Sequence, residues 1–165
     1  VYTYQPRLGE SQGNFNRVIE DNGRVGFVLD RLRGEEAAIA EGEGQWAAAT
    51  FASPYTTEVF YYTRWNPMGD GSELWQTFAV DGSLANWDDE TPAGVGEQIA
   101  AAIAVRFTLP PGQTRQIPFV LAWDFPVTEF AAGVNYYRRY TDFFGRTGDH
   151  AWAIARTGLK MHQTW

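Results

Sequence analysis

The sequence predicts a mainly β protein, an antiparallel β-sandwich that forms part of a larger sandwich, with short helices at its C-terminal end. Turn-forming residues interrupt the first half often, as at Asp21-Asn22-Gly23 and Asp81-Gly82. The runs between these turns are short and rich in β-branched and aromatic residues. Frequent turns between short strands are typical of antiparallel sheets.

Three strands are predicted in the first half, at 24–32, 46–51 and 57–65. Each run alternates partly between apolar and polar side chains, as a strand with one buried face should. A hairpin is predicted over 98–123, with its turn at 110–113. Pro118 lies within its returning strand and predicts an irregularity there, because proline cannot donate to a sheet ladder.

The pattern changes after Gly133. Residues 135–144 place aromatic side chains four apart, which fits a short helix or turn, or a tightly packed extended segment; we prefer the helix or turn. From Thr147 a helix is predicted, with Thr147 or Asp149 as its capping residue and an apolar face that continues toward Trp165. Since this pattern runs to the last residue, we expect the parent chain to continue.

The composition of the chain excludes some classes of function. The 165 residues carry a formal net charge of −7, which argues against nucleic acid as a partner. No apolar stretch is long enough for a transmembrane helix. The chain has no cysteine, which is compatible with a reducing compartment, so the cytoplasm is the default expectation.

Asp124 and Glu129 raise the question of a catalytic carboxylate pair, because glycoside hydrolysis requires two such groups across a sugar. We favour the alternative, in which Asp124 ends a buried strand and hydrogen-bonds the following turn, while Glu129 is solvated. The histidines, His150 and His162, lack the spacing of paired metal ligands on a helix, and no cofactor motif occurs. We therefore predict no metal and no cofactor.

The tryptophans Trp65, Trp75 and Trp87 are candidates for a platform on which a sugar ring stacks. Aromatic residues more often belong to the core, because each buries a large apolar area. The residues alone therefore predict a β-sandwich with a terminal helix and no convincing catalytic set.

Several long motifs resemble one family. LPPGQTRQIPFVLAWDFP, NYYRRYTDFFG and the helix with Ala151, Trp152, Ile154 and Ala155 follow one another in the C-terminal third. With GEGQW, GDGSELWQTFAVDG and the region around Asn86-Trp87-Asp88, they resemble the N-terminal domain of non-lysosomal glucosylceramidases, the β-glucosidases of glycoside hydrolase family 116. The match covers most of residues 41–165.

This resemblance implies a β-sandwich domain packed against a C-terminal (α/α)6 barrel that hydrolyses β-glucosides, glucosylceramide among them, with retention. The family's catalytic Glu and Asp lie in that barrel, so the chain alone should lack catalytic carboxylates and its partner should be the barrel. We expect a sandwich portion at 1–134 and a connecting segment with a helix at 135–165. Residues assigned to the domain interface are Asp124, Glu129, Arg138, Arg139 and Tyr140.

An alternative remains: an autonomous carbohydrate-binding sandwich that uses exposed aromatic residues. A self-sufficient hydrolase acting through Asp124 and Glu129 is the third and least favoured hypothesis.

Overall fold

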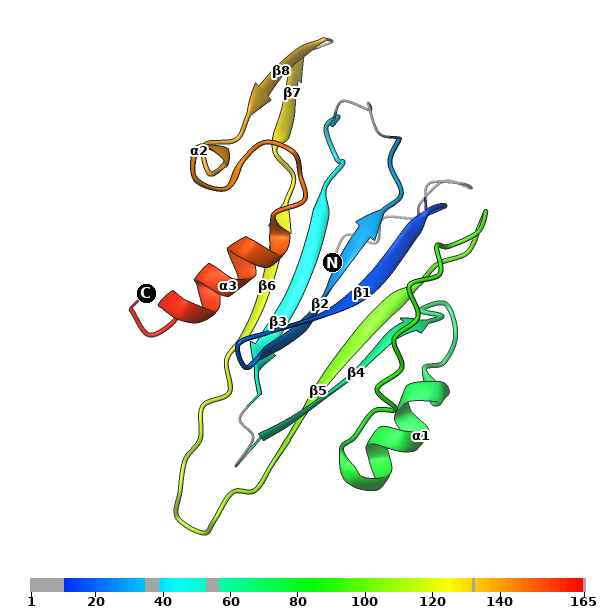
Figure 1. Ribbon diagram of the computed structural model, residues 1–165. Helices are drawn as coiled ribbons and strands as arrows, with labels where there is room; N and C mark the ends of the chain where they lie inside the picture. The colour runs from blue at the N-terminus through cyan, green and yellow to red at the C-terminus, as the bar shows by residue number, and fades with distance from the viewer. Residues whose placement is uncertain (1–10, 35–38, 53–56, 132, 165) are drawn as a thin grey trace.

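The computed structural model describes residues 11–34, 39–52, 57–131 and 133–164, and it confirms a mainly β fold with antiparallel sheets (Figure 1). In chain order the elements are β1 (Asn14–Asp21), β2 (Arg24–Arg31), β3 (Gln45–Phe51), β4 (Thr57–Trp65), α1 (Ser72–Asp81), β5 (Ala100–Phe107), β6 (Phe119–Asp124), β7 (Val127–Ala131), β8 (Val134–Tyr137), α2 (Thr141–Phe144) and α3 (Ala151–Met161).

The largest sheet has four strands in the order β1-β2-β3-β6. Its β1-β2 hairpin turns at Asn22 and Gly23, which have φ angles of 49° and 76°. Positive φ at both central residues is what a tight hairpin turn requires, and Asn followed by Gly adopts it at the lowest cost. The predicted turn at Asp21-Asn22-Gly23 therefore sets the register in which Asp21 pairs with Arg24.

Helix α3 covers one face of this sheet over β3 and β6 (Figure 1). Small side chains dominate this contact, and the buried cluster consists of Val28, Ala47, Ala49, Ala122, Ala151, Ala155 and Leu159. Gly158 extends the small surface, since a Cβ there would lie 3.2 Å from Cγ1 of Val120. Small residues on both elements let the helix approach the sheet closely, so little space remains between them.

The opposite face of the four-stranded sheet is partly covered by the two-stranded β4-β5 sheet. Strand β4 contacts β1, β2 and β3. The buried amide of Asn16 in β1 donates a 2.6 Å hydrogen bond to the carbonyl oxygen of Thr63 in β4. Val25 and Phe27 of β2, which point to this face, are buried. The chain is thus layered as helix α3, a four-stranded sheet and the β4-β5 sheet.

The hairpin predicted over 98–123 is wrong. Strand β5 pairs with β4, and β6 pairs with β3, so the two predicted arms belong to different sheets. Alternation identifies a strand but not its neighbour, and the connection at 108–118 is long enough to cross between layers. Strand β6 begins at Phe119, directly after Pro118, instead of running through it.

Two further elements differ from the sequence predictions. Helix α3 begins at Ala151 with His150 as its N-cap, instead of with Thr147 or Asp149. Residues 135–137 lie in β8, and only 141–144 of the preferred helical segment form a helix. Helix α1 was not predicted; it lies between Gly71 and Gly82, whose φ angles of 72° and 76° end the helix at both sides.

Candidate functional site

Asp124, the last residue of β6, lies where three elements meet. Its side chain is fully buried. One carboxylate oxygen accepts a 2.7 Å hydrogen bond from the phenol of Tyr140, just before α2, and the other accepts a 2.9 Å bond from the backbone N–H of His150. Both carboxylate oxygens are therefore occupied by the protein, and neither faces a substrate.

The bond to His150 places the Asp124 carboxylate at the N-terminus of α3. His150 is the N-cap of this helix, and its own side chain makes no capping hydrogen bond. The first N–H groups of a helix have no partner within it, and negative charge is favourable there. The imidazole Nδ1 of His150 also lies 3.4 Å from the Asp124 carboxylate. Asp124 thus supplies the charge and the acceptor that this helix end needs.

Tyr140 connects this junction to α2. Burial raises the pKa of its phenol, and the hydrogen bond to the negatively charged Asp124 raises that pKa further. The neighbouring chain is held by Thr141, whose hydroxyl donates a 2.7 Å hydrogen bond to the carbonyl oxygen of Arg138. The backbone N–H of Arg138 in turn donates to the carbonyl oxygen of Pro126 at 2.8 Å. These bonds fix the base of the β7-β8 hairpin beside Asp124.

Glu129 lies on β7 and is exposed, in contrast with Asp124. Its carboxylate accepts a 3.1 Å hydrogen bond from the backbone N–H of Gly133, in the turn of the hairpin. The structure therefore places the two carboxylates in different surroundings, one buried in a junction and one on a projecting hairpin. Nothing in this arrangement resembles two carboxylates that face each other across a sugar.

The β7-β8 hairpin and α2 project from the four-stranded sheet (Figure 1) and carry an exposed apolar surface. The exposed residues, called the hairpin patch below, are Phe130, Val134, Tyr136, Tyr137 and Phe143. They lie on both faces of the hairpin, because Tyr136 and Tyr137 are neighbours in β8. A two-stranded hairpin is marginally stable in water, and contiguous exposed apolar patches commonly mark interaction sites. The hairpin patch is therefore a candidate contact surface.

Arg138 and Arg139 follow the hairpin directly and are exposed. Neither forms an ion pair within the part of the chain that the structure describes. Arginine commonly binds carboxylates at protein interfaces, because its planar guanidinium presents several donors at once. The two side chains therefore lie beside the hairpin patch with their charges turned to solvent. The structure thus brings Asp124, Tyr140, Arg138 and Arg139 to one region.

The three candidate sugar-stacking tryptophans do not form one platform. Trp75 on α1 is 65% exposed and packs beside Phe78, with ring centroids 5.7 Å apart. Trp87 is 53% exposed and adjoins β4 through a parallel bridge to Tyr62. Trp65 is half-buried at the end of β4, and its buried Nε1 has no hydrogen-bond partner among the described residues. No ring contact joins any two of these three within the described chain.

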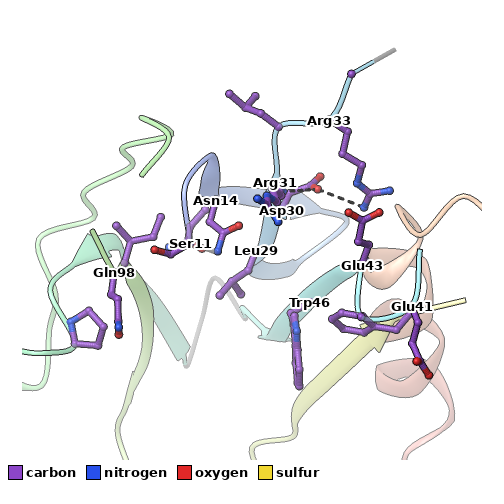
Figure 2. A pocket seen from close by; sticks show the side chains of 18 residues that line it. Ser11, Asn14, Leu29, Asp30, Arg31, Arg33, Glu41, Glu43, Trp46 and Gln98 are labelled. Carbon is purple, nitrogen blue, oxygen red and sulfur yellow. Dashed lines mark hydrogen bonds and ion pairs between the residues drawn. The ribbon is translucent and has the colours of Figure 1, made fainter. Parts of the chain in front are cut away.

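A cleft of about 940 Å³ opens between the two sheets near the end of β2. Figure 2 shows Trp46 and Gln98 on opposite sides of the cleft, with Leu29 and Asn14 between them. Asp30 and Arg33 form an ion pair at its rim, with 3.9 Å between the charged atoms. The cleft therefore has a mixed lining, in which the amides of Asn14 and Gln98 lie among aromatic and aliphatic side chains, and a charged rim.

The sequence analysis did not predict two features of this part of the structure. His150 contacts Asp124 from 26 positions away in the sequence, and no local pattern marks that pairing. Trp46 and Trp123 lie side by side on neighbouring strands, with ring centroids 5.5 Å apart, and both are exposed. The alternation of large and small residues in FVLAW would have placed Phe119, Leu121 and Trp123 on one face.

The described residues contain no group of three or more His, Cys, Asp or Glu side chains that could hold a metal ion. Nor do they contain a helix with the length and hydrophobicity needed to cross a membrane.

The chain matches a known protein family. The family model described as beta-glucosidase 2, glycosyl-hydrolase family 116 N-term, matches residues 4–165. The match therefore covers nearly the whole chain, including the junction at Asp124 and the hairpin patch.

Proposed function

The chain belongs to the N-terminal domain family of glycosyl-hydrolase family 116, and from this membership we propose that it supports the catalytic barrel of a retaining β-glucosidase or glucosylceramidase. The observation that carries the proposal is the match over residues 4–165. The chain is then a non-catalytic part of a glycosidase, and its partner is the C-terminal catalytic domain of the same parent. The substrate of the parent would be a β-glucoside such as glucosylceramide.

In this proposal the catalytic domain carries out the hydrolysis. There a carboxylate would attack the anomeric carbon, and a second carboxyl group would protonate the leaving oxygen and then activate water. The sandwich portion at 1–134 and the connecting segment at 135–165 would hold that domain in place. A cytoplasmic location belongs to the same proposal.

The hairpin patch and its neighbours are the proposed contact with the catalytic domain. Phe130 and Tyr136 pack edge to face, with ring centroids 6.4 Å apart, and both are largely exposed. Arg138 and Arg139 extend the surface with positive charge. Asp124 and Tyr140 would contribute by fixing the base of the hairpin, and Glu129 by bonding its turn. An apolar centre with arginine beside it is typical of protein interfaces.

Substitution of the hairpin patch tests this contact in the intact parent enzyme. Phe130→Ser with Tyr136→Ser should shorten the half-life of aryl β-glucosidase activity at elevated temperature, because burial at the interface would be lost. Val80→Ser on α1 is a matched control, since Val80 is 83% exposed and lies on another element. Equal half-lives for the patch variant and the control would argue against the hairpin as the contact.

A second candidate function is binding of carbohydrate by the sandwich itself. The exposure of Trp75 and Trp87 favours it, because a sugar ring can stack only on an accessible aromatic face. Titration with glucosides, followed by tryptophan fluorescence, separates the two candidates. A saturable change that Trp75→Ala or Trp87→Ala abolishes would support binding, and no change at millimolar sugar would remove it.

A further inference from the structure

The cleft near the end of β2 brings aromatic and polar side chains together in one cavity of about 940 Å³. We propose that this cleft binds a neutral carbohydrate of at least two sugar rings. The site is separate from the surface tryptophans Trp75 and Trp87, and it does not depend on the supporting role toward the catalytic barrel.

One face of the four-stranded sheet, the face that β4 contacts, lines the cleft. Asn16 of β1 pairs with Leu29 of β2, and Leu29 pairs with Trp46 of β3. These three side chains therefore form one row across the sheet, with an amide at one end and an indole at the other. Arg31 and Asn14 pair in the next row on the same face. The strand register thus gives the cleft a polar end and an aromatic end.

The indole of Trp46 provides the aromatic end. It is 40% exposed, and its orientation is set by two neighbouring rings. The ring of Trp123 lies 5.5 Å away between centroids, and that of Phe125 packs edge to face at 5.6 Å. A sugar ring can pack its C–H groups on an accessible aromatic face. Because Trp46 is already held in place, little side-chain freedom would be lost on binding.

The polar end of the cleft carries hydrogen-bonding groups that the described part of the chain does not use. Among the described residues, the guanidinium of Arg31 and the amides of Asn14 and Gln98 have no hydrogen-bond partner. An amide both donates and accepts hydrogen bonds, and a guanidinium donates several. Sugar hydroxyls also do both, so they match this mixture. Gln98 lines the cleft from the residues before β5, which places polar groups on both sides of it (Figure 2).

The charged rim, in contrast, is already bound within the protein. The Asp30 carboxylate accepts a 2.7 Å hydrogen bond from the amide of Gln45. The guanidinium of Arg33 donates to the carbonyl oxygens of Thr147 and Gly148 at 2.9 Å and 3.0 Å. These bonds hold the shape of the rim and leave ligand contacts to the polar and aromatic ends.

The charge and size of the cleft favour a neutral ligand larger than one sugar. The carboxylates of its lining are those of Asp30, Glu41 and Glu43, and the guanidiniums are those of Arg31 and Arg33. The whole chain carries a net charge of −7, and a field of this sign disfavours anions. Ligand sites commonly have volumes of roughly 300–1,000 Å³. At about 940 Å³ the cleft lies near the upper end of this range, which leaves room for more than one sugar ring.

Fluorine NMR of the intact parent protein, labelled with 5-fluorotryptophan, tests the proposal. The probe is thiocellobiose, a cellobiose analogue in which sulfur joins the two rings, so that a glycosidase cannot hydrolyse it during the titration. The signal of Trp46 is identified as the one that Trp46→Phe removes. Asn14→Ala and Arg31→Ala test the polar end of the cleft. Trp75→Ala is the matched control for sugar that binds at α1.

We expect the Trp46 signal to shift saturably at millimolar thiocellobiose. Asn14→Ala and Arg31→Ala should each raise the Kd measured from this signal about fivefold, because each removes a hydrogen bond to the sugar. Trp75→Ala should leave that Kd unchanged. The proposal is overturned if the Trp46 signal does not shift, if Trp75→Ala abolishes the shift, or if both polar variants leave the Kd unchanged. Because neither activity nor thermal half-life is measured, this result and the test of the supporting role can fail independently.

Discussion

The phenol of Tyr140 donates a 2.7 Å hydrogen bond to the fully buried carboxylate of Asp124. This bond ties the base of the projecting hairpin to the end of β6. The second oxygen of the same carboxylate ties β6 to the start of α3 through the N–H of His150. One side chain thus sets the relative positions of three elements.

Loss of the Asp124 carboxylate should be costly. Asp124→Ala leaves the Tyr140 phenol and the His150 N–H without their acceptor, and each buried group that loses its partner costs about 1–3 kcal/mol. We expect the free energy of unfolding to fall by at least about 2 kcal/mol, measured by urea denaturation. Asp142→Ala on α2 is the control, because Asp142 is exposed and its ion pair with Arg146 spans 3.4 Å. Equal effects for the two variants would contradict the junction.

Tyr140→Phe should remove one of these hydrogen bonds and lower the free energy of unfolding by about 1 kcal/mol. Tyr136→Phe, on the exposed hairpin, is the control and should have little effect. The dependence of stability on pH in the alkaline range is a more specific test of this bond. The folded phenol has a raised pKa, so above the ordinary value of about 10 the folded state holds a proton that the unfolded state loses. Stability should therefore fall as pH rises above about 10, and Tyr140→Phe should reduce that slope.

Absorbance near 295 nm checks the same point directly. Burial raises the pKa of Tyr61 as well as that of Tyr140, so both should ionise at higher pH than the exposed tyrosines. Tyr140→Phe should remove one of these two late-ionising tyrosines and leave the other. If the titration curves of the two proteins differ only by an ordinary tyrosine, the raised pKa is wrong.

The close contact between α3 and the sheet predicts intolerance of larger side chains. Ala155 is fully buried in the alanine-rich cluster, and Ala155→Leu should lower the free energy of unfolding by about 1–3 kcal/mol or more. Lys160→Leu on the exposed face of the same helix should change it by less than about 0.5 kcal/mol. Thermal unfolding followed by circular dichroism measures both. Tolerance of Ala155→Leu would show that the helix lies further from the sheet.

Asn16 links the two sheets, and its removal should weaken that connection. Its buried amide bonds the carbonyl oxygen of Thr63, so Asn16→Ala should cost about 1–2 kcal/mol and raise hydrogen exchange in β4. Asn14→Ala, on the same strand but half-buried, is the control. If exchange in β4 rises no more for Asn16→Ala than for Asn14→Ala, the interlayer bond does not contribute to stability.

Local patterns in the sequence predicted much of this fold but not its pairings. The strand at 57–65 was predicted at its observed bounds, because alternation and the flanking turns are local signals. The partner of β5 was not, since AAAIAVRF would fit beside β4 or β6 equally well and the layers decide between them. Helix α1 was missed because it buries none of its residues, and its apolar stripe of Leu74, Trp75 and Phe78 is too short to mark a helix.

The candidate site could also be predicted from the sequence only in part. Asp124 could be predicted as a strand-ending carboxylate from its place after FVLAW, but its partners could not. The bonds it accepts come from residues 16 and 26 positions away, and hydrogen bonds across such distances follow from the packing of α2 and α3. The domain division at 134 and 135 and the interface assignment remain predictions.

The central claim is that this domain supports the catalytic barrel, and addition of the domain to the isolated barrel tests it most directly. The barrel of the parent enzyme is assayed on an aryl β-glucoside with and without an excess of the N-terminal domain, and the half-life of activity at elevated temperature is recorded. We predict that the domain prolongs the half-life and that the Phe130→Ser, Tyr136→Ser variant does so less. A barrel that is fully active and equally long-lived without the domain would contradict the claim.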